Sequence, residues 1–212
     1  MNTRLLLISH ASTAAMRAGR FPADDPLDAR GLAEAQAARK RLAMPDDDAA
    51  VFVSPAVCAR DTALALGLAA TVDTTLADID YGKWHGRRLV DLANEAPQDL
   101  AAWTRDPDFA AHGGESFSQL VERMGEWLDA LDDAISEGTS GTSRRGMSDA
   151  TSAPRQTSRN VIAVTHAPVI RAALVHALGA PPAMFPRIEI APLSLVELRR
   201  SQRGWTWRPA SH

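Results

Sequence analysis

Two histidines of the sequence stand in the same local context. His10 follows LLLIS, His166 follows VIAVT, and alanine comes next in both places. Imidazole acts as a nucleophile or exchanges protons near neutral pH. Ligands of open α/β sheets bind beyond the carboxyl ends of the strands, so two histidines placed there can face one pocket. The local sequence leaves two interpretations open, a catalytic pair or two histidines that only end strands.

The elements that must position these histidines are predicted from hydrophobic patterning. Short apolar runs predict buried strands over residues 5–8, 51–53, 161–165 and 193–198. Helical patterns lie between these runs. Strands that alternate with helices predict an α/β domain with a mainly parallel sheet and helices on both faces.

Capping signals delimit three of the predicted helices. Asp28 is placed to cap a helix through residues 33–42, and Ser116 with Gln119 forms a capping box for an amphipathic helix over 116–135. A third helix is predicted from Pro168 to about Leu178, with Gly179 as its stop.

Residues 136–159 have a different composition from the rest of the chain. They are rich in Ser, Thr, Gly and Arg, with almost no apolar residue to bury. This predicts a disordered insertion within a single domain that spans residues 1–212.

Composition argues against several classes of partner. The chain of 212 residues has a net charge of −3 and a pI near 6.1, which gives no pull toward nucleic acid or an acidic membrane. No apolar stretch approaches the roughly 18 residues of a membrane span. A single cysteine, Cys58, excludes an intrachain disulfide and fits a reducing cytoplasm. We therefore expect a cytoplasmic protein without nucleic-acid or membrane partners.

Six segments in order resemble the histidine phosphatase superfamily, the phosphoglycerate mutase-like group. They read SHAST, DDPLDARGLAEAQA, VFVSPAVCARDTA, LADIDYGKWHG, HGGESFSQLVERM and VTHAPVIRAAL, at residues 9–13, 24–37, 51–63, 76–86, 112–124 and 164–174. The resemblance implies a three-layer α/β/α sandwich around a mainly parallel sheet. It also implies that His10 and His166 end adjacent strands, and that parts of the region 70–116 close over the pocket.

The resemblance further implies a phosphohistidine mechanism. His10 would attack phosphorus and become phosphorylated, and His166 would donate hydrogen bonds to the phosphoryl oxygens. Asp78 takes the place of the family's usual glutamate as the general acid. Asp80 is the less favoured carboxylate, expected on the other side of an extended segment. No cofactor is implied, and no His-x-His or His-Glu-x-x-His spacing marks a metal ligand.

The chain departs from the family pattern at two arginines that clamp the phosphoryl group. Ser9 and Cys58 stand in their places. Arg60, two residues further on, lies about 200° around a helix from Cys58 and cannot simply substitute. The candidate substrate-binding residues are Ser9, Thr13, Arg17, Arg20, Cys58, His112 and Ser116.

The predicted function is a metal-independent phosphomonoesterase that acts on a small phosphorylated metabolite, with activity reduced if the two arginines are not replaced. A phosphatase is favoured over a mutase because the chain shows no clear extra segments for holding a phosphoglycerate carboxylate. The alternative is a weak or inactive pseudophosphatase that binds a phosphorylated ligand or a protein partner. A third hypothesis is catalysis on a substrate other than a phosphate dianion, since the pocket is expected to have fewer positive charges than those of family members with both arginines.

Overall fold

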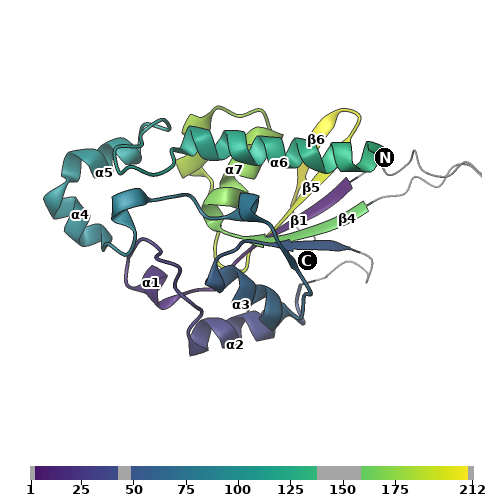
Figure 1. Cartoon of the computed structure of the whole chain (residues 1–212), viewed down its shortest axis with the longest axis horizontal. Helices are drawn as coiled ribbons and strands as arrows, with labels where there is room; N and C mark the ends of the chain where they lie inside the picture. The colour runs from purple at the N-terminus through teal and green to yellow at the C-terminus, as the bar shows by residue number, and fades with distance from the viewer. Residues whose placement is uncertain (1–2, 43–48, 138–158, 210–212) are drawn as a thin grey trace, which may run out of the picture.

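A mixed sheet forms the centre of the computed structural model, which describes residues 3–42, 49–137 and 159–209 (Figure 1). The strand order is β3-β2-β4-β1-β5-β6. Strands β1 to β4 are parallel, whereas β5 is antiparallel to β1, and β6 to β5. The mainly parallel sheet is therefore confirmed. The bounds are β1 (Thr3–Ser9), β2 (Ala50–Val53), β3 (Thr71–Val72), β4 (Arg159–Thr165), β5 (Leu195–Ser201) and β6 (Gly204–Arg208).

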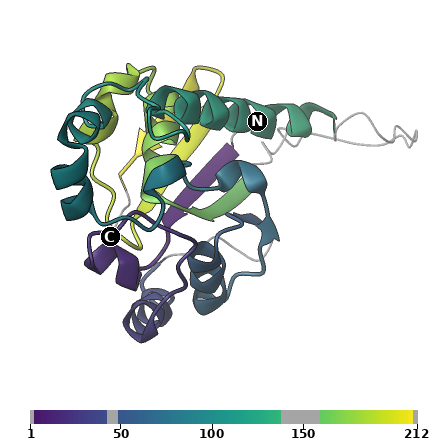
Figure 2. The same ribbon diagram turned by 60° about the vertical axis from the view of Figure 1, so that its left-hand side comes forward.

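Helices cover both faces of the sheet and make the expected three layers. Helices α6 (Phe117–Glu137) and α7 (Ala167–Ala177) lie on one face, with α2 (Ala29–Ala38) and α3 (Val57–Leu66) on the other (Figures 1 and 2). The short helices lie beyond the carboxyl end of β1 or in connecting loops. They are α1 (Ala14–Arg17), α4 (Leu89–Glu95), α5 (Pro97–Trp103) and the 3-10 turns Thr74–Leu76, Gly82–Trp84 and Pro182–Arg187.

The core lies on both faces of β1. Leu5 and Leu7 face the cluster under α6 and α7, whereas Leu6 and Ile8 face the cluster under α3. All four side chains are fully buried. A continuous apolar run is what a parallel strand needs when helices cover both of its faces.

The predicted caps hold in the structure. The Asp28 carboxylate accepts a hydrogen bond from the Gly31 N–H at 2.9 Å, although the helix that it caps is Ala29–Ala38 rather than 33–42. Ser116 and Gln119 exchange hydrogen bonds of 2.9 and 3.2 Å at the start of α6, as the capping box predicts. Gly179 takes a left-handed φ of 59° just after α7.

Both ends of the predicted insertion 136–159 differ from the expectation. Helix α6 continues to Glu137 and β4 already begins at Arg159. The segment between them lies outside the described residues, so its disorder stays a prediction. Within the described ranges, no helix combines the length and the apolar character needed to cross a membrane.

Candidate active site

Strand pairing brings the two strand-end histidines together. Ser9 of β1 pairs with Thr165 of β4, and the His10 N–H donates to the Thr165 carbonyl at 2.8 Å. The next residues, His10 and His166, therefore lie side by side, with ring centroids 5.0 Å apart and planes inclined by 63°. This confirms that they end adjacent strands.

The His10 ring is held in one tautomer. Its Nδ1 lies 2.8 Å from the Ala11 carbonyl oxygen, which can only accept, so Nδ1–H donates and Nε2 carries the lone pair. Burial, and then the neighbouring His166, lower the pKa of His10 to about 4. His10 is therefore neutral at pH 7 and has a free lone pair, as a nucleophile requires.

Helix α3 fixes the loop that follows His10. The Ala11 N–H donates to Thr62 Oγ1 at 3.0 Å, and the Thr62 hydroxyl donates to the Cys58 carbonyl at 2.7 Å. Thr13 ends this loop by accepting a hydrogen bond from the Met16 N–H at 3.2 Å, which caps α1. These contacts place Cys58 beside the His10 ring.

His166 is buried and has one of its two ring nitrogens in a hydrogen bond. Its Nε2 lies 2.8 Å from the hydroxyl of Ser54, which is fully buried. Its Nδ1 lies 3.4 Å from an Asp78 carboxylate oxygen but has no hydrogen-bond partner among the described residues. Burial, and then Arg123, lower the pKa of His166 to about 3, so this ring is also neutral at pH 7.

A partly buried arginine holds the segment that carries Asp78. The Arg123 guanidinium donates to the carbonyls of Thr75 and Ala77 at 2.5 and 3.1 Å, and to both oxygens of Glu115 at 2.8 and 2.7 Å. The Glu115 carboxylate therefore positions a loop.

Burial raises the pKa of the Asp78 carboxyl to about 6, against the opposing effect of His10. Asp78 thus holds a proton through mildly acidic pH, as a general acid must. Asp80 is different: the Gly82 N–H, and then His85, lower its pKa. The Asp80 side chain is 61% exposed, whereas that of Asp78 is 18% exposed.

A cavity of about 380 Å³ opens onto these groups. The lining includes six of the predicted site residues, His10, Thr13, Arg20, Cys58, Asp78 and His166. Asp80 lines it as well, because residues two apart in an extended segment point to the same side; the expectation that it points away is wrong.

The charge of the lining is unusual for a phosphate site. Among the described residues that line the cavity, Arg20 is the only arginine, and it faces Asp25 at 3.5 Å. The carboxylates that line the cavity outnumber it: Asp24, Asp25, Asp78 and Asp80. Cys58 lines the cavity, and burial raises the pKa of its thiol to about 12. Arg60 is exposed and absent from the lining, as its place on the helix predicts.

The side chains of two predicted substrate-binding residues form hydrogen bonds with the backbone instead. The Ser9 hydroxyl donates to the Ala191 carbonyl at 2.6 Å and accepts from the Ser194 N–H at 3.0 Å. Ser116 caps α6. Neither lines the cavity.

Arg17 and His112 are also outside the cavity lining. Arg17 forms an ion pair with Asp28. His112 is buried and accepts a hydrogen bond from the Gly114 N–H at 3.0 Å through Nδ1. The structure therefore does not bring these two residues to the site.

Some residues that line the cavity were not predicted from the sequence. His85 lies there with its Nε2 2.8 Å from Asp80, and Asp24 joins the loop before α2 to the start of α3 by accepting from the Val57 N–H at 2.8 Å. His85 lies in the segment LADIDYGKWHG, which resembles the family without indicating that this side chain lines the cavity. Nothing in the local sequence indicated that Asp24 lines the cavity.

Comparison with curated proteins finds relatives that this chain matches in part. It is 33% identical over 135 residues to a bifunctional protein of Mycobacterium tuberculosis, a match that covers 61% of this chain and 37% of that protein. It is 29% identical over 125 residues to the glucosyl-3-phosphoglycerate phosphatase of Mycolicibacterium vanbaalenii, covering 57% of this chain and 56% of that protein. The matches therefore span about a third to a half of the length of these relatives.

Solved structures match over almost the whole chain. A mycobacterial glucosyl-3-phosphoglycerate phosphatase in complex with VO3 has a TM-score of 0.77 and 26% identity, covering 97% of this chain and 96% of that chain. The α-ribazole phosphatase of Shigella flexneri has a TM-score of 0.77 at 23% identity, covering 97% of this chain and 94% of that chain, and is similar in fold. The sequence matches the histidine phosphatase superfamily (branch 1) over residues 5–210, and the chain belongs to that superfamily.

Proposed function

We propose that this protein is a phosphomonoesterase that works through a phosphohistidine on His10 and needs no metal ion. The observation that carries the proposal is the neutral His10 ring. Its Nδ1–H donates to the Ala11 carbonyl, and its Nε2 lone pair is free beside His166. Both rings and Asp78 line the same cavity.

In the first step, the Nε2 lone pair of His10 attacks phosphorus and the bond between phosphorus and the leaving oxygen breaks. Asp78 gives its proton to that oxygen, and the alcohol departs. His166, 3% exposed, faces the transferred group and stabilises the charge on its oxygens. In the second step, water attacks phosphorus, the N–P bond breaks, and the Asp78 carboxylate takes the proton from water.

The low positive charge of the cavity bears on the substrate. With carboxylates outnumbering the one arginine in the lining, the pocket suits a phosphoryl group that carries a single negative charge better than a dianion. The cavity volume of about 380 Å³ fits a small metabolite. The relatives named above as phosphatases act on small phosphorylated metabolites, and we propose the same class here.

A second candidate function is a pseudophosphatase that binds a phosphorylated ligand or a protein partner without turnover. The cysteine and serine in place of two arginines favour it. Removing one preorganised donor to a developing oxyanion typically costs about 10²–10³ in rate.

The buried, unpaired Cys58 thiol agrees with a reducing compartment, and we propose a cytoplasmic location and a single domain over residues 1–212.

The test is hydrolysis of p-nitrophenyl phosphate by the purified chain, with and without EDTA, beside His10→Ala. We expect turnover that survives EDTA and is lost in His10→Ala. His176→Gln is the matched control, because His176 lies on α7 outside the cavity lining. Turnover that EDTA abolishes would overturn the metal-independent mechanism. If a panel of phosphomonoesters gives no turnover above His10→Ala while vanadate still binds, the pseudophosphatase reading stands.

A further inference from the structure

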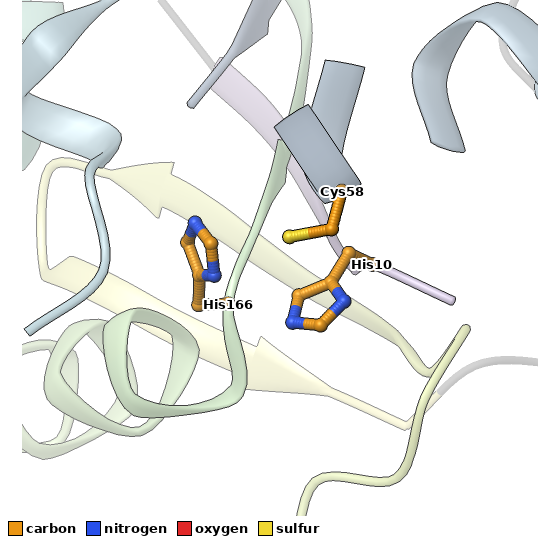
Figure 3. A group of neighbouring side chains, drawn as sticks. All are labelled: His10, Cys58 and His166. Atoms are coloured by element: carbon orange, nitrogen blue, oxygen red, sulfur yellow. The ribbon is translucent and has the colours of Figure 1, made fainter. Parts of the chain in front are cut away.

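Three atoms of metal-ligand type meet at the base of the cavity. One ring nitrogen each of His10 and His166 and the Cys58 sulfur lie within 4.8 Å of one another. Figure 3 shows the sulfur and a nitrogen of His10 directed toward the space beside the His166 ring. The three residues come from the end of β1, from α3 and from the end of β4, so no local sequence spacing announces the cluster.

The outer nitrogens of both histidines lie within hydrogen-bond distance of an oxygen, as they do in metal sites. A metal-bound histidine almost always donates its other N–H to an oxygen. Here His10 Nδ1 lies 2.8 Å from the Ala11 carbonyl, and His166 Nε2 lies 2.8 Å from the Ser54 hydroxyl. Each ring therefore presents its remaining nitrogen to the cluster in a fixed orientation.

Within the described part of the chain, one inner ligand atom lacks a hydrogen-bond partner and another belongs to no disulfide. His166 Nδ1 is buried and has no hydrogen-bond partner among the described residues, and Cys58 is a free cysteine. An unpaired polar atom in a buried place is costly, and a metal ion would satisfy it. Asp78 approaches the same nitrogen at 3.4 Å, too far to replace a ligand bond.

The chemistry of the donor set selects the ion. Two imidazoles and a thiolate suit zinc and similar ions, whereas magnesium and calcium take oxygen ligands. Tetrahedral zinc, with bonds of about 2.0–2.3 Å, sets its ligand atoms about 3.3–3.6 Å apart. The cluster reaches that geometry when its side chains close by about 1 Å, and the half-exposed His10 ring borders open cavity.

We propose that His10, Cys58 and His166 form a binding site for one zinc-class ion, with a fourth position open to water from the cavity. On binding, the thiol gives its proton to solvent and the sulfur forms the metal bond. The same His10 lone pair serves the ion and the phosphoryl group, so a bound ion blocks phosphoryl transfer. The site itself rests on geometry alone, and its existence does not depend on the proposed function.

The experiment uses Co²⁺ as a spectroscopic substitute for zinc. We expect the purified, metal-free chain to bind one Co²⁺ with a thiolate-to-cobalt charge-transfer band, which zinc abolishes by displacement. Cys58→Ser, which is nearly the same size, loses the band, whereas His176→Gln keeps it. Circular dichroism of each variant shows whether it is folded.

Calorimetry with Zn²⁺ gives a second readout on the unaltered chain. We expect one site per chain, weakened at least about tenfold in Cys58→Ser and in His166→Gln, since even the loss of an outer partner costs that much. Absence of binding to the unaltered chain, or an unchanged band in Cys58→Ser, would overturn the inference.

Turnover separates this inference from the proposed function. If EDTA-insensitive hydrolysis is present and neither Co²⁺ nor Zn²⁺ binds, the metal site is wrong and the phosphatase stands. If the ion binds through Cys58 and the metal-free chain shows no turnover, the metal site stands and the proposed phosphatase activity is wrong. With both correct, zinc abolishes hydrolysis and EDTA restores it.

Discussion

His10 and His166 occupy equivalent places on two neighbouring parallel strands, and their ring centroids lie 5.0 Å apart. His166 is buried and His10 is partly buried, and the charge of His166, were it protonated, would further lower the pKa of His10. The stable state at neutral pH is thus a pair of uncharged rings. This pair combines a free nucleophile with a second ring whose nearest acid is Asp78, at 3.4 Å.

The pH dependence of turnover follows from two shifted groups. His10 must be unprotonated, and its pKa is lowered to about 4; Asp78 must be protonated, and its pKa is raised to about 6. We expect kcat/KM of the metal-free chain to rise as pH increases through about 4 and to fall through about 6, with an optimum near pH 5. An optimum above pH 7 would contradict this assignment.

Asp78→Asn tests the general acid. We expect a loss of about 10²–10⁴ in kcat for an alkyl phosphate, whose leaving oxygen needs a proton, and a much smaller loss for p-nitrophenyl phosphate. If Asp78 causes the fall of kcat/KM above pH 6, that fall disappears in Asp78→Asn. If the ionisation of the substrate causes it, the fall persists in the variant. Asp80→Asn is the matched control, and an equal loss there would show that Asp78 holds no special role.

Introducing an arginine at position 58 tests whether the low positive charge of the cavity limits the rate. We expect Cys58→Arg to raise kcat/KM for a phosphomonoester by about 10², within the range that one oxyanion donor supplies. The side chain projects into the cavity that Cys58 already lines. Arg60→Ala, an exposed neighbour on α3, is expected to leave the rate unchanged. An unchanged rate in folded Cys58→Arg would show that charge is not limiting.

Arg123→Met tests the support of the Asp78 segment. We expect the free energy of unfolding to fall by about 2–3 kcal/mol, because the Glu115 carboxylate and the carbonyls of Thr75 and Ala77 lose a charged donor. Arg30→Met removes an exposed pair with Glu34 and is expected to change stability by less than about 0.5 kcal/mol. Urea unfolding measures both, and equal losses would contradict the proposed support.

Strands buried on both faces were predictable, and exposed strands were not. The continuous apolar runs of β1 and β4 mark them directly, since helices cover both sides. Strand β3 has two exposed residues, and β6 buries only Trp205 among Gly204–Arg208. Their positions depend on pairing with β2 and β5, which local composition does not encode.

The site was predictable where a side chain follows directly from strand register. His10 and His166 follow paired residues of parallel strands, so their proximity was implied by the pattern. Ser9 precedes His10 but turns its hydroxyl to Ala191, and sequence alone cannot distinguish such a buried structural serine from a ligand. The closeness of Cys58 to both histidines depends on how α3 packs, which is a long-range property.

Strand β1 lies in the middle of the sheet, between β4 and β5, although the ribosome makes it long before either of them. At about 5–20 residues per second, the residues up to the end of β4 take roughly 8–30 s to follow. During that time Leu5, Leu6, Leu7 and Ile8 have neither neighbouring strand to pair with. We therefore expect the nascent chain to depend on chaperones that shield apolar segments, and fragments that end before β4 to aggregate.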